Sequence, residues 1–201
     1  MTPGVSAGHL SGGSEDGGRP KSDFYPTPAW ATQALLAREE IRSTDKIWEP
    51  AAGDGAMVDE LTLAAPVIAS DIEPRRKDIF EMDFLNASEI HTVDHVITNP
   101  PFKLAQAFIE KSKQVASKKI AMFLKIQFLE GITRLPMFLD KEFPLARIYV
   151  FSRRVSLTRD GKPMKNGGTM CFAWFVWDRL SQGQPIINWI DDGPPKNPKT
   201  T

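Results

Sequence analysis

The chain has 201 residues, of which 41% are hydrophobic, and it carries 25 acidic and 25 basic residues. This length fills one core better than two, so a single domain is predicted. A formal net charge of zero argues against a protein that coats nucleic acid by bulk electrostatics, and no apolar run is long enough to cross a bilayer. The single cysteine, Cys171, excludes an internal disulfide and favours a reducing, cytoplasmic setting.

Both ends of the chain have the composition of unstructured segments. Residues 1–22 are rich in Gly and Ser, have mixed charge and lack the apolar stretch of a signal peptide, so we predict a disordered N-terminal tail. A role for this tail as a basic arm for DNA is disfavoured, because Glu15 and Asp16 offset Arg19 and Lys21. Residues 191–201 contain three prolines and are predicted to form a flexible C-terminal tail, which leaves residues 23–190 as the domain.

The first elements of the domain enclose a glycine loop. A helix is predicted over 30–40, a strand over 46–48 and a second helix over 56–65, with the sequence Glu49-Pro50-Ala51-Ala52-Gly53-Asp54-Gly55 between that strand and the second helix. Two glycines at this place let the backbone pass close to a ligand. Val58 stands where a dinucleotide fingerprint has a small residue, and Glu49 would repel phosphate, so a cationic or hydroxyl-bearing ligand is favoured.

Two carboxylates follow later in the first half of the chain. The strand predicted over 67–70 ends in Asp71-Ile72, where the acid is placed to accept hydrogen bonds from ribose hydroxyls and the isoleucine to pack on a base; the alternative is a solvated aspartate at a strand end. The segment 79–85 brings Asp83-Phe84, a pair that suits an exocyclic amine and an adenine ring, or else a surface acid beside a core aromatic.

The next strand, predicted over 91–97, leads into Asn99-Pro100-Pro101-Phe102 and a crossover helix over 105–116. Two consecutive prolines fix φ twice and remove two amide donors. The sequence therefore predicts a rigid polar clamp at the end of this strand.

The second half of the chain continues with strands over 118–124, 147–151 and 169–178 and an edge strand over 186–190. Between them, the loop 152–169 has five basic residues and a single acid, and we weigh a phosphate-contacting role equally with a solvated loop. The basic residues are Arg153, Arg154, Arg159, Lys162 and Lys165.

Alternating strands and helices predict an α/β fold with a mostly parallel sheet and helices on both faces. Such sheets bind ligands outside the carboxyl ends of their strands. The glycine loop, Asp71, Asp83 and Asn99 all come at such ends, so we expect them to meet in one site.

These motifs, in this order, resemble the class I S-adenosylmethionine-dependent methyltransferases, and among them the enzymes that methylate adenine N6 in DNA. The resemblance covers about residues 23–178 and implies a Rossmann-like, seven-stranded fold. It implies that S-adenosyl-L-methionine is the cofactor, and its contacts would come from four segments. These are Tyr25, Thr27 and Pro28; Glu49, Pro50, Ala51, Gly53 and Gly55; Asp71 and Ile72 with Asp83 and Phe84; and Asn99.

The resemblance also makes Asn99, Pro100, Pro101 and Phe102 the catalytic tetrapeptide. The Asn99 side-chain oxygen and the Pro100 carbonyl would accept the two N6 hydrogens of a flipped adenine, on which Phe102 would stack, in a reaction that requires no metal. Asn99 favours adenine over cytosine, because the family tends to use Ser at this position for cytosine N4.

Larger members of the family carry a separate target-recognition domain, and seven strands leave no room for one here. The compact form resembles phage-encoded adenine methyltransferases and their relatives in restriction-modification. It implies double-stranded DNA held by the basic loop, with short or relaxed sequence specificity. The alternatives are an RNA adenine or a protein glutamine as the acceptor, although Phe102 disfavours glutamine, or a non-catalytic nucleic-acid-binding protein. The oligomeric state stays open.

Overall fold

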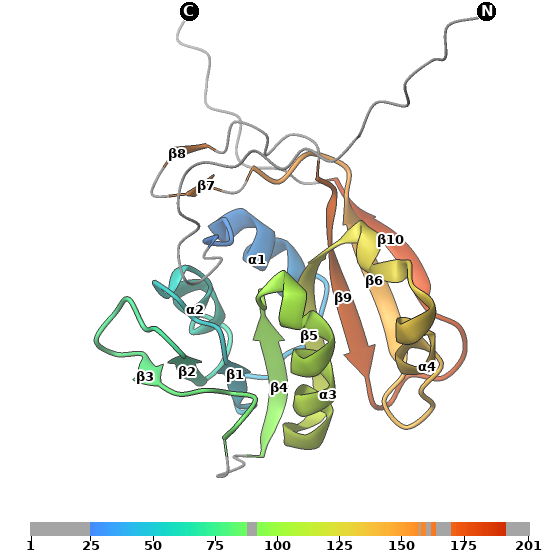
Figure 1. The fold of residues 1–201 in the computed structure, drawn as a ribbon, viewed down its shortest axis with the longest axis horizontal. Helices are drawn as coiled ribbons and strands as arrows, with labels where there is room; N and C mark the ends of the chain where they lie inside the picture. The colour runs from blue at the N-terminus through green and yellow to red at the C-terminus, as the bar shows by residue number, and fades with distance from the viewer. Residues whose placement is uncertain (1–24, 88–91, 157, 160–161, 164–169, 192–201) are drawn as a thin grey trace, which may run out of the picture.

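The computed structural model describes residues 25–87, 92–156, 158–159, 162–163 and 170–191, so the predicted tails lie almost wholly outside the described residues. The strands of the main sheet are β1 (Ile47–Glu49), β2 (Val67–Asp71), β3 (Phe80–Glu81), β4 (Val93–Thr98), β5 (Ala116–Lys125), β6 (Leu145–Phe151), β9 (Phe172–Asp178) and β10 (Ile186–Ile190). Within the described part of the chain, these strands form one eight-stranded sheet in the order β10-β6-β9-β5-β4-β1-β2-β3 (Figure 1).

The sheet is mostly parallel, as predicted. Parallel pairing joins β3, β2, β1, β4 and β5 in a row, and it also joins β10 to β6. Among these strands only β9, which lies between β5 and β6, runs antiparallel to its neighbours. The sheet has eight strands where the sequence predicts seven, because the segment 79–85 adds the two-residue β3. At the other edge, β10 confirms the strand predicted over 186–190.

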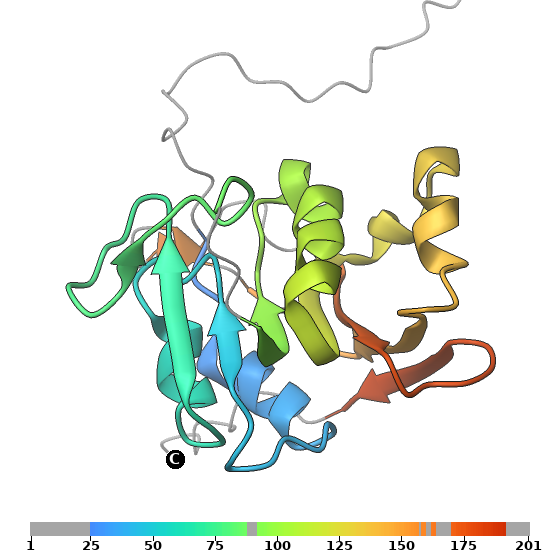
Figure 2. The ribbon, with the colours of Figure 1, turned by 90° about the horizontal axis from the view of Figure 1, so that it is seen from below.

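Helices cover both faces of the sheet, as Figure 2 shows. One face carries α1 (Ala29–Leu36) and α2 (Ala56–Leu61), and the other carries α3 (Ala105–Val115) and α4 (Leu135–Phe138). Strand β5 shows why two cores form, because Met122 and Leu124 pack with the α3 side whereas Ala121 and Phe123 pack with the α1 side. This alternation follows from the two-residue period of a strand.

The helices are shorter than predicted. The first ends at Leu36 rather than Glu40, and the second at Leu61 rather than Ala65. Short 3-10 turns lie after β4 at η1 (Phe102–Leu104), after β5 at η2 (Ile126–Leu129) and before α4 at η3 (Ile132–Arg134). The basic loop contains two paired antiparallel strands of two residues each, β7 (Thr158–Arg159) and β8 (Lys162–Pro163), where the sequence predicts a loop without strands.

A buried ion cluster ties the chain after α1 to the sheet. The Glu39 carboxylate is 8% exposed and accepts hydrogen bonds from Arg147 at 2.5 and 2.9 Å, from Lys119 at 2.8 Å and from the Tyr149 hydroxyl at 2.9 Å. Burial alone would raise the Glu39 pKa, but the hydrogen bonds from Arg147 and Lys119 outweigh it and lower the pKa. The cluster therefore fixes where α1, and the segment before it, lies against β5 and β6.

Replacing Glu39 by Gln should lower the free energy of unfolding by about 3 kcal/mol, because the partly buried Lys119 loses its carboxylate partner and Arg147 keeps only Asp178. Chemical unfolding followed by circular dichroism measures this. The loss should shrink as the pH falls, since a carboxylate with a lowered pKa contributes stability above its ordinary pKa and loses it in acid. Glu40→Gln is the matched control: its exposed carboxylate pairs with Arg42 at 3.5 Å, and its loss should cost less than about 0.5 kcal/mol. Equal losses in the two variants would contradict the assignment.

Within the described ranges, no helix has the length and apolarity that a membrane crossing needs.

Candidate active site

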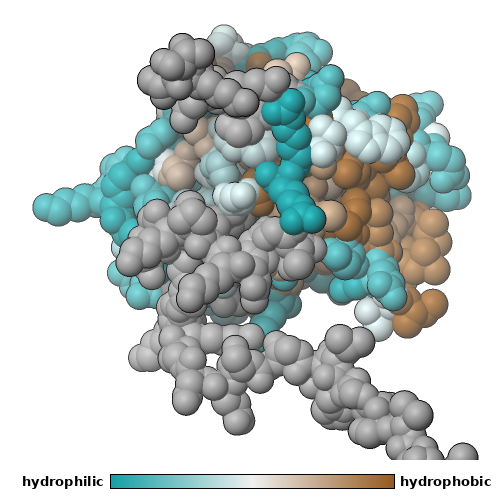
Figure 3. All heavy atoms as spheres, turned by 90° about the horizontal axis from the view of Figure 1, so that it is seen from above, coloured by the Kyte–Doolittle hydropathy of each residue, from teal (hydrophilic) through white to brown (hydrophobic). Residues whose placement is uncertain are grey.

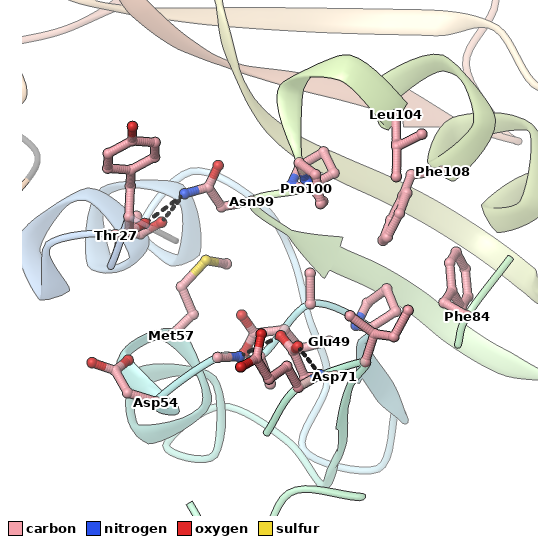
Figure 4. A pocket seen from close by; sticks show the side chains of 18 of the residues that line it. Thr27, Glu49, Asp54, Met57, Asp71, Phe84, Asn99, Pro100, Leu104 and Phe108 are labelled. Carbon is pink, nitrogen blue, oxygen red and sulfur yellow. Dashed lines mark hydrogen bonds between the residues drawn. The ribbon is translucent and has the colours of Figure 1, made fainter. Parts of the chain in front are cut away.

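A cavity of about 660 Å³ opens at the carboxyl end of the parallel strands. Its walls come from the segment before α1, the loop after β1, the ends of β2 and β3, and the chain from the end of β4 into α3 (Figure 4). Of the residues that the sequence singles out, those that line it are Tyr25, Thr27, Glu49, Pro50, Ala51, Gly53, Asp71, Ile72, Asp83, Phe84, Asn99, Pro100, Pro101 and Phe102. The predicted meeting of the motifs in one place is thus observed, while their roles stay predictions.

Two predicted residues do not line the cavity. Pro28 is the N-cap of α1, and Gly55 is the N-cap of α2. Each residue instead joins a lining segment to the helix that follows it, Pro28 to α1 and Gly55 to α2. Gly55 has φ +85°, and a Cβ there would lie 2.3 Å from the Arg76 guanidinium carbon. Arg76 is held in turn by Asp59 and Asp78, each at 2.7 Å.

Asp71 holds the glycine loop in place. Its Oδ2 accepts a hydrogen bond from the Gly53 amide at 2.8 Å, and its Oδ1 accepts one from the Glu73 amide at 2.8 Å. A carboxylate oxygen has two lone pairs, so each oxygen of Asp71 can accept one more hydrogen bond. This arrangement is compatible with the predicted contact to two hydroxyl groups.

Glu49 places a buried carboxyl group in the wall of the cavity. It is 2% exposed, and among the described residues its Oε2 has no hydrogen-bond partner. Burial, reinforced by the negative charges of Asp71 and Asp54, raises its pKa well above the ordinary glutamate value. An unsatisfied buried carboxyl is costly, and a cationic or hydrogen-bond-donating ligand would remove that cost.

Asp83 and Phe84 follow β3 and are the residues predicted to contact the adenine of the cofactor. The Asp83 carboxylate caps its own turn, with Oδ1 at 3.0 Å from the Leu85 amide and Oδ2 at 2.7 Å from the Asn86 side-chain nitrogen. Phe84 is 2% exposed and packs edge-on against Trp48, with ring centroids 5.1 Å apart. Phe84 is therefore part of the core as well as of the cavity wall, so any ligand meets it at the base of the cavity.

Asn99 stands at the end of β4 with its amide in a fixed orientation. Its Nδ2 donates to the Tyr25 carbonyl at 3.1 Å and to the Thr27 hydroxyl at 3.0 Å, as the dashed lines in Figure 4 show. Both hydrogens of the amide nitrogen are thus used on one side. The Asn99 Oδ1 remains as a hydrogen-bond acceptor.

Phe102 begins the 3-10 turn after the two prolines and is half-buried. The Lys125 ammonium lies 4.7 Å from its ring centroid, and the Phe172 ring lies 5.9 Å away in a tilted arrangement. A cation therefore stands over the aromatic ring that the sequence predicts to stack on a base.

The predicted nucleic-acid residues lie only partly within the described residues. Arg153 and Arg154 are exposed in the chain after β6, Arg159 lies in β7 and Lys162 in β8, and Lys165 lies outside the described residues. Figure 1 places β7 and β8 beyond the carboxyl end of the sheet, which is also the end where the cavity opens.

Several lining residues were missed by the sequence reasoning: Asp54, Met57, Lys103, Leu104 and Phe108. Asp54 lies inside the glycine motif and was open to prediction from it. Met57 and Phe108 look like ordinary core positions of helices, and nothing in their spacing marks them as cavity residues.

Comparison with known proteins shows which fold this chain shares. No family model matches the chain, and no curated protein matches it. Three solved structures share its fold at low sequence identity. A Pyrococcus horikoshii protein assigned as an RNA methyltransferase is 16% identical, with a TM-score of 0.59 over 81% of this chain and 91% of its own. A modification subunit assigned to a type I restriction enzyme of Vibrio vulnificus is 14% identical, with a TM-score of 0.58 over 87% of this chain and 48% of its own.

The third, a Listeria monocytogenes protein assigned as a class I S-adenosylmethionine-dependent methyltransferase, is 13% identical, with a TM-score of 0.52 over 80% of this chain and 61% of its own. The chain therefore has the Rossmann-like fold of the class I methyltransferases, as the sequence predicts.

Replacing Glu49 by Gln should stabilise the ligand-free protein, and increasingly so as the pH rises. A glutamate whose pKa is raised in the folded state contributes stability below its ordinary pKa and loses it as the pH rises toward the raised value. Glutamine has no such loss. Thermal unfolding of the ligand-free protein across the acidic to neutral range measures the difference, and wild-type and variant curves that stay parallel would contradict it.

Replacing Gly55 by Ala should destabilise the protein more than replacing Gly183 by Ala. Both glycines have a positive φ, of +85° and +99°, so both variants carry the left-handed strain of about 1 kcal/mol. Only Gly55 faces the clamped Arg76, whereas a Cβ at Gly183 meets nothing within 4 Å. Chemical unfolding compares the two variants, and equal losses would show that Arg76 yields freely.

Proposed function

We propose that this protein is a DNA adenine-N6 methyltransferase that uses S-adenosyl-L-methionine. The observation that carries the proposal is the position of Asn99-Pro100-Pro101-Phe102 at the end of β4, on the same cavity as Glu49, Asp71 and Asp83. The class I methyltransferase fold supports the cofactor, and the tetrapeptide supports an exocyclic amine as the acceptor.

The residues of the cavity fit this cofactor, which supplies an activated methyl group on a positively charged sulfonium. Asp71 would bind the ribose hydroxyls with the lone pairs that Gly53 and Glu73 leave free. The unsatisfied carboxyl of Glu49 supports a ligand that is cationic or donates hydrogen bonds. Tyr25 would cover the methionine end, and Asp83 would lie near the amine of the cofactor's adenine.

The chemistry assigned to the clamp follows from its acceptors. An adenine amine is a poor nucleophile because its lone pair is delocalised into the ring. Asn99 Oδ1 and the Pro100 carbonyl would accept the two N6 hydrogens and favour a pyramidal nitrogen whose lone pair points at the methyl group. In the proposed transfer, the N6–carbon bond would form as the sulfur–carbon bond breaks, and one N6 proton would then leave to solvent.

The DNA substrate is supported by the aromatic and basic groups around the opening. The target base has to leave the duplex, because its N6 cannot reach the cavity from within the stack. A base that stacks on the Phe102 face now covered by Lys125 would displace that ammonium toward the phosphates. Arg153, Arg154, Arg159, Lys162 and Lys165 would hold the backbone, with the short or relaxed specificity of compact phage-type and restriction-modification enzymes.

Replacing Asn99 by Ala should abolish methyl transfer, because the acceptor for the amine is lost. Cofactor affinity should fall by about tenfold or less, because Asn99 is only one of several predicted cofactor contacts. The measurement is labelled methyl transfer to unmethylated double-stranded DNA, with cofactor binding followed by calorimetry. Wild-type protein that binds the cofactor and leaves DNA unlabelled would overturn the proposal.

The same assay separates the alternatives. DNA, RNA and protein acceptors should be compared side by side, because amides and RNA adenines also present two hydrogens on nitrogen. The preferred outcome is labelled DNA, and expression in a host without adenine methylation, followed by sequencing of modified positions, would then give the recognition site. DNA binding without cofactor binding would favour the non-catalytic alternative.

A further inference from the structure

We infer that Thr27 and the Tyr25 carbonyl are positioning groups that orient the Asn99 amide, so that its oxygen and not its nitrogen is left for the acceptor amine. The catalytic meaning of this inference rests on the proposed function. The orientation itself does not, because it follows from hydrogen bonds within the protein.

The chemistry of the partners decides the orientation. A backbone carbonyl can only accept a hydrogen bond, so the group of Asn99 that lies 3.1 Å from the Tyr25 oxygen must be the nitrogen. The same nitrogen lies 3.0 Å from the Thr27 hydroxyl, which serves as the second acceptor. The amide is planar, and with both Nδ2 hydrogens engaged on this side, Oδ1 is left on the other.

The two acceptors come from a segment that is itself held firmly. Thr27 is 3% exposed and lies between two prolines, which restrict the backbone on each side. The segment continues into α1, where Ala31 is fully buried and its carbonyl accepts a hydrogen bond from the Trp174 indole at 2.8 Å. The position of Thr27 relative to the end of β4 is therefore set by the packing of α1 on the sheet.

These hydrogen bonds require an asparagine at position 99. An aspartate has the same shape and would also offer an acceptor oxygen. Here an ionised aspartate would face the Tyr25 carbonyl with an oxygen, and neither of the two could donate a hydrogen bond. Thr27 could turn its hydroxyl to donate, but the carbonyl of Tyr25 could not adapt.

The first test compares Thr27→Val with Thr27→Ser and Thr32→Val. Valine keeps the shape of threonine and removes the acceptor, and serine keeps the acceptor. Thr32 is the matched control, since it is a fully buried threonine of α1 whose hydroxyl has no partner among the described residues. Circular dichroism verifies that each variant is folded.

Two readouts are needed. In heteronuclear NMR, the Asn99 side-chain amide, assigned from its loss in Asn99→Ala, should lose exchange protection at one hydrogen in Thr27→Val and keep it in the serine and Thr32 variants. In methyl transfer to DNA, Thr27→Val should lower kcat about tenfold, the factor of one ordinary hydrogen bond, with the cofactor KM changed less than about twofold.

The second test is Asn99→Asp, which does not depend on the folding of a Thr27 variant. Asn99→Asp should lose most of its methyl transfer while still binding cofactor. Wild-type activity in Asn99→Asp would overturn the inference, and so would an unchanged Asn99 amide in a folded Thr27→Val. A fall in cofactor affinity in the valine and serine variants alike would also overturn it, because Thr27 would then act on the cofactor directly. If wild type methylates nothing, the proposed function fails and the NMR comparison still decides the orientation.

Discussion

The cavity depends on carboxylates that hold loop backbone at the strand ends. A parallel sheet leaves amides unpaired where its strands stop, and two aspartates take up those amides here. Asp71 joins the loop after β1 to the turn after β2 by accepting from Gly53 and Glu73, and Asp83 closes the turn after β3 through the Leu85 amide. Because these bonds lie within the protein, the floor of the cavity is formed before any ligand enters.

Charge is divided between the cavity and its surroundings. The ionised acids Asp54, Asp71, Glu73 and Asp83 line the cavity and outnumber the cations Arg75 and Lys103 there, while Arg153 and Arg154 lie on exposed chain after β6. A polyanion would be attracted to the outside and repelled from the inside, whereas a neutral base or a cationic group would enter freely. If the proposed function holds, a chain of zero net charge would in this way keep a cationic cofactor and a phosphate backbone in separate places.

The sequence predicted where the site lies better than it predicted the hydrogen bonds and packing within the site. Asp71 and Asn99 were predictable because each follows an apolar strand, and parallel strands bring their carboxyl ends to one edge. The hydrogen bonds from Asn99 to Tyr25 and Thr27 span more than 70 residues and depend on where α1 packs, which no local pattern encodes. The core packing of Phe84 depends in the same way on the Trp48 ring from another strand.

The orientation of Asn99 also bears on the kind of acceptor that the proposed reaction can use. An oxygen acceptor fixed at the end of β4 binds a group that has hydrogens to donate, and together with the neighbouring Pro100 carbonyl it would match a group with two of them. A hydroxyl has one hydrogen and would leave one acceptor unsatisfied in a partly buried site, which is costly. An amine or amide nitrogen satisfies both. Under the proposed function, this pair of acceptors would therefore favour nitrogen over oxygen as the methylated atom.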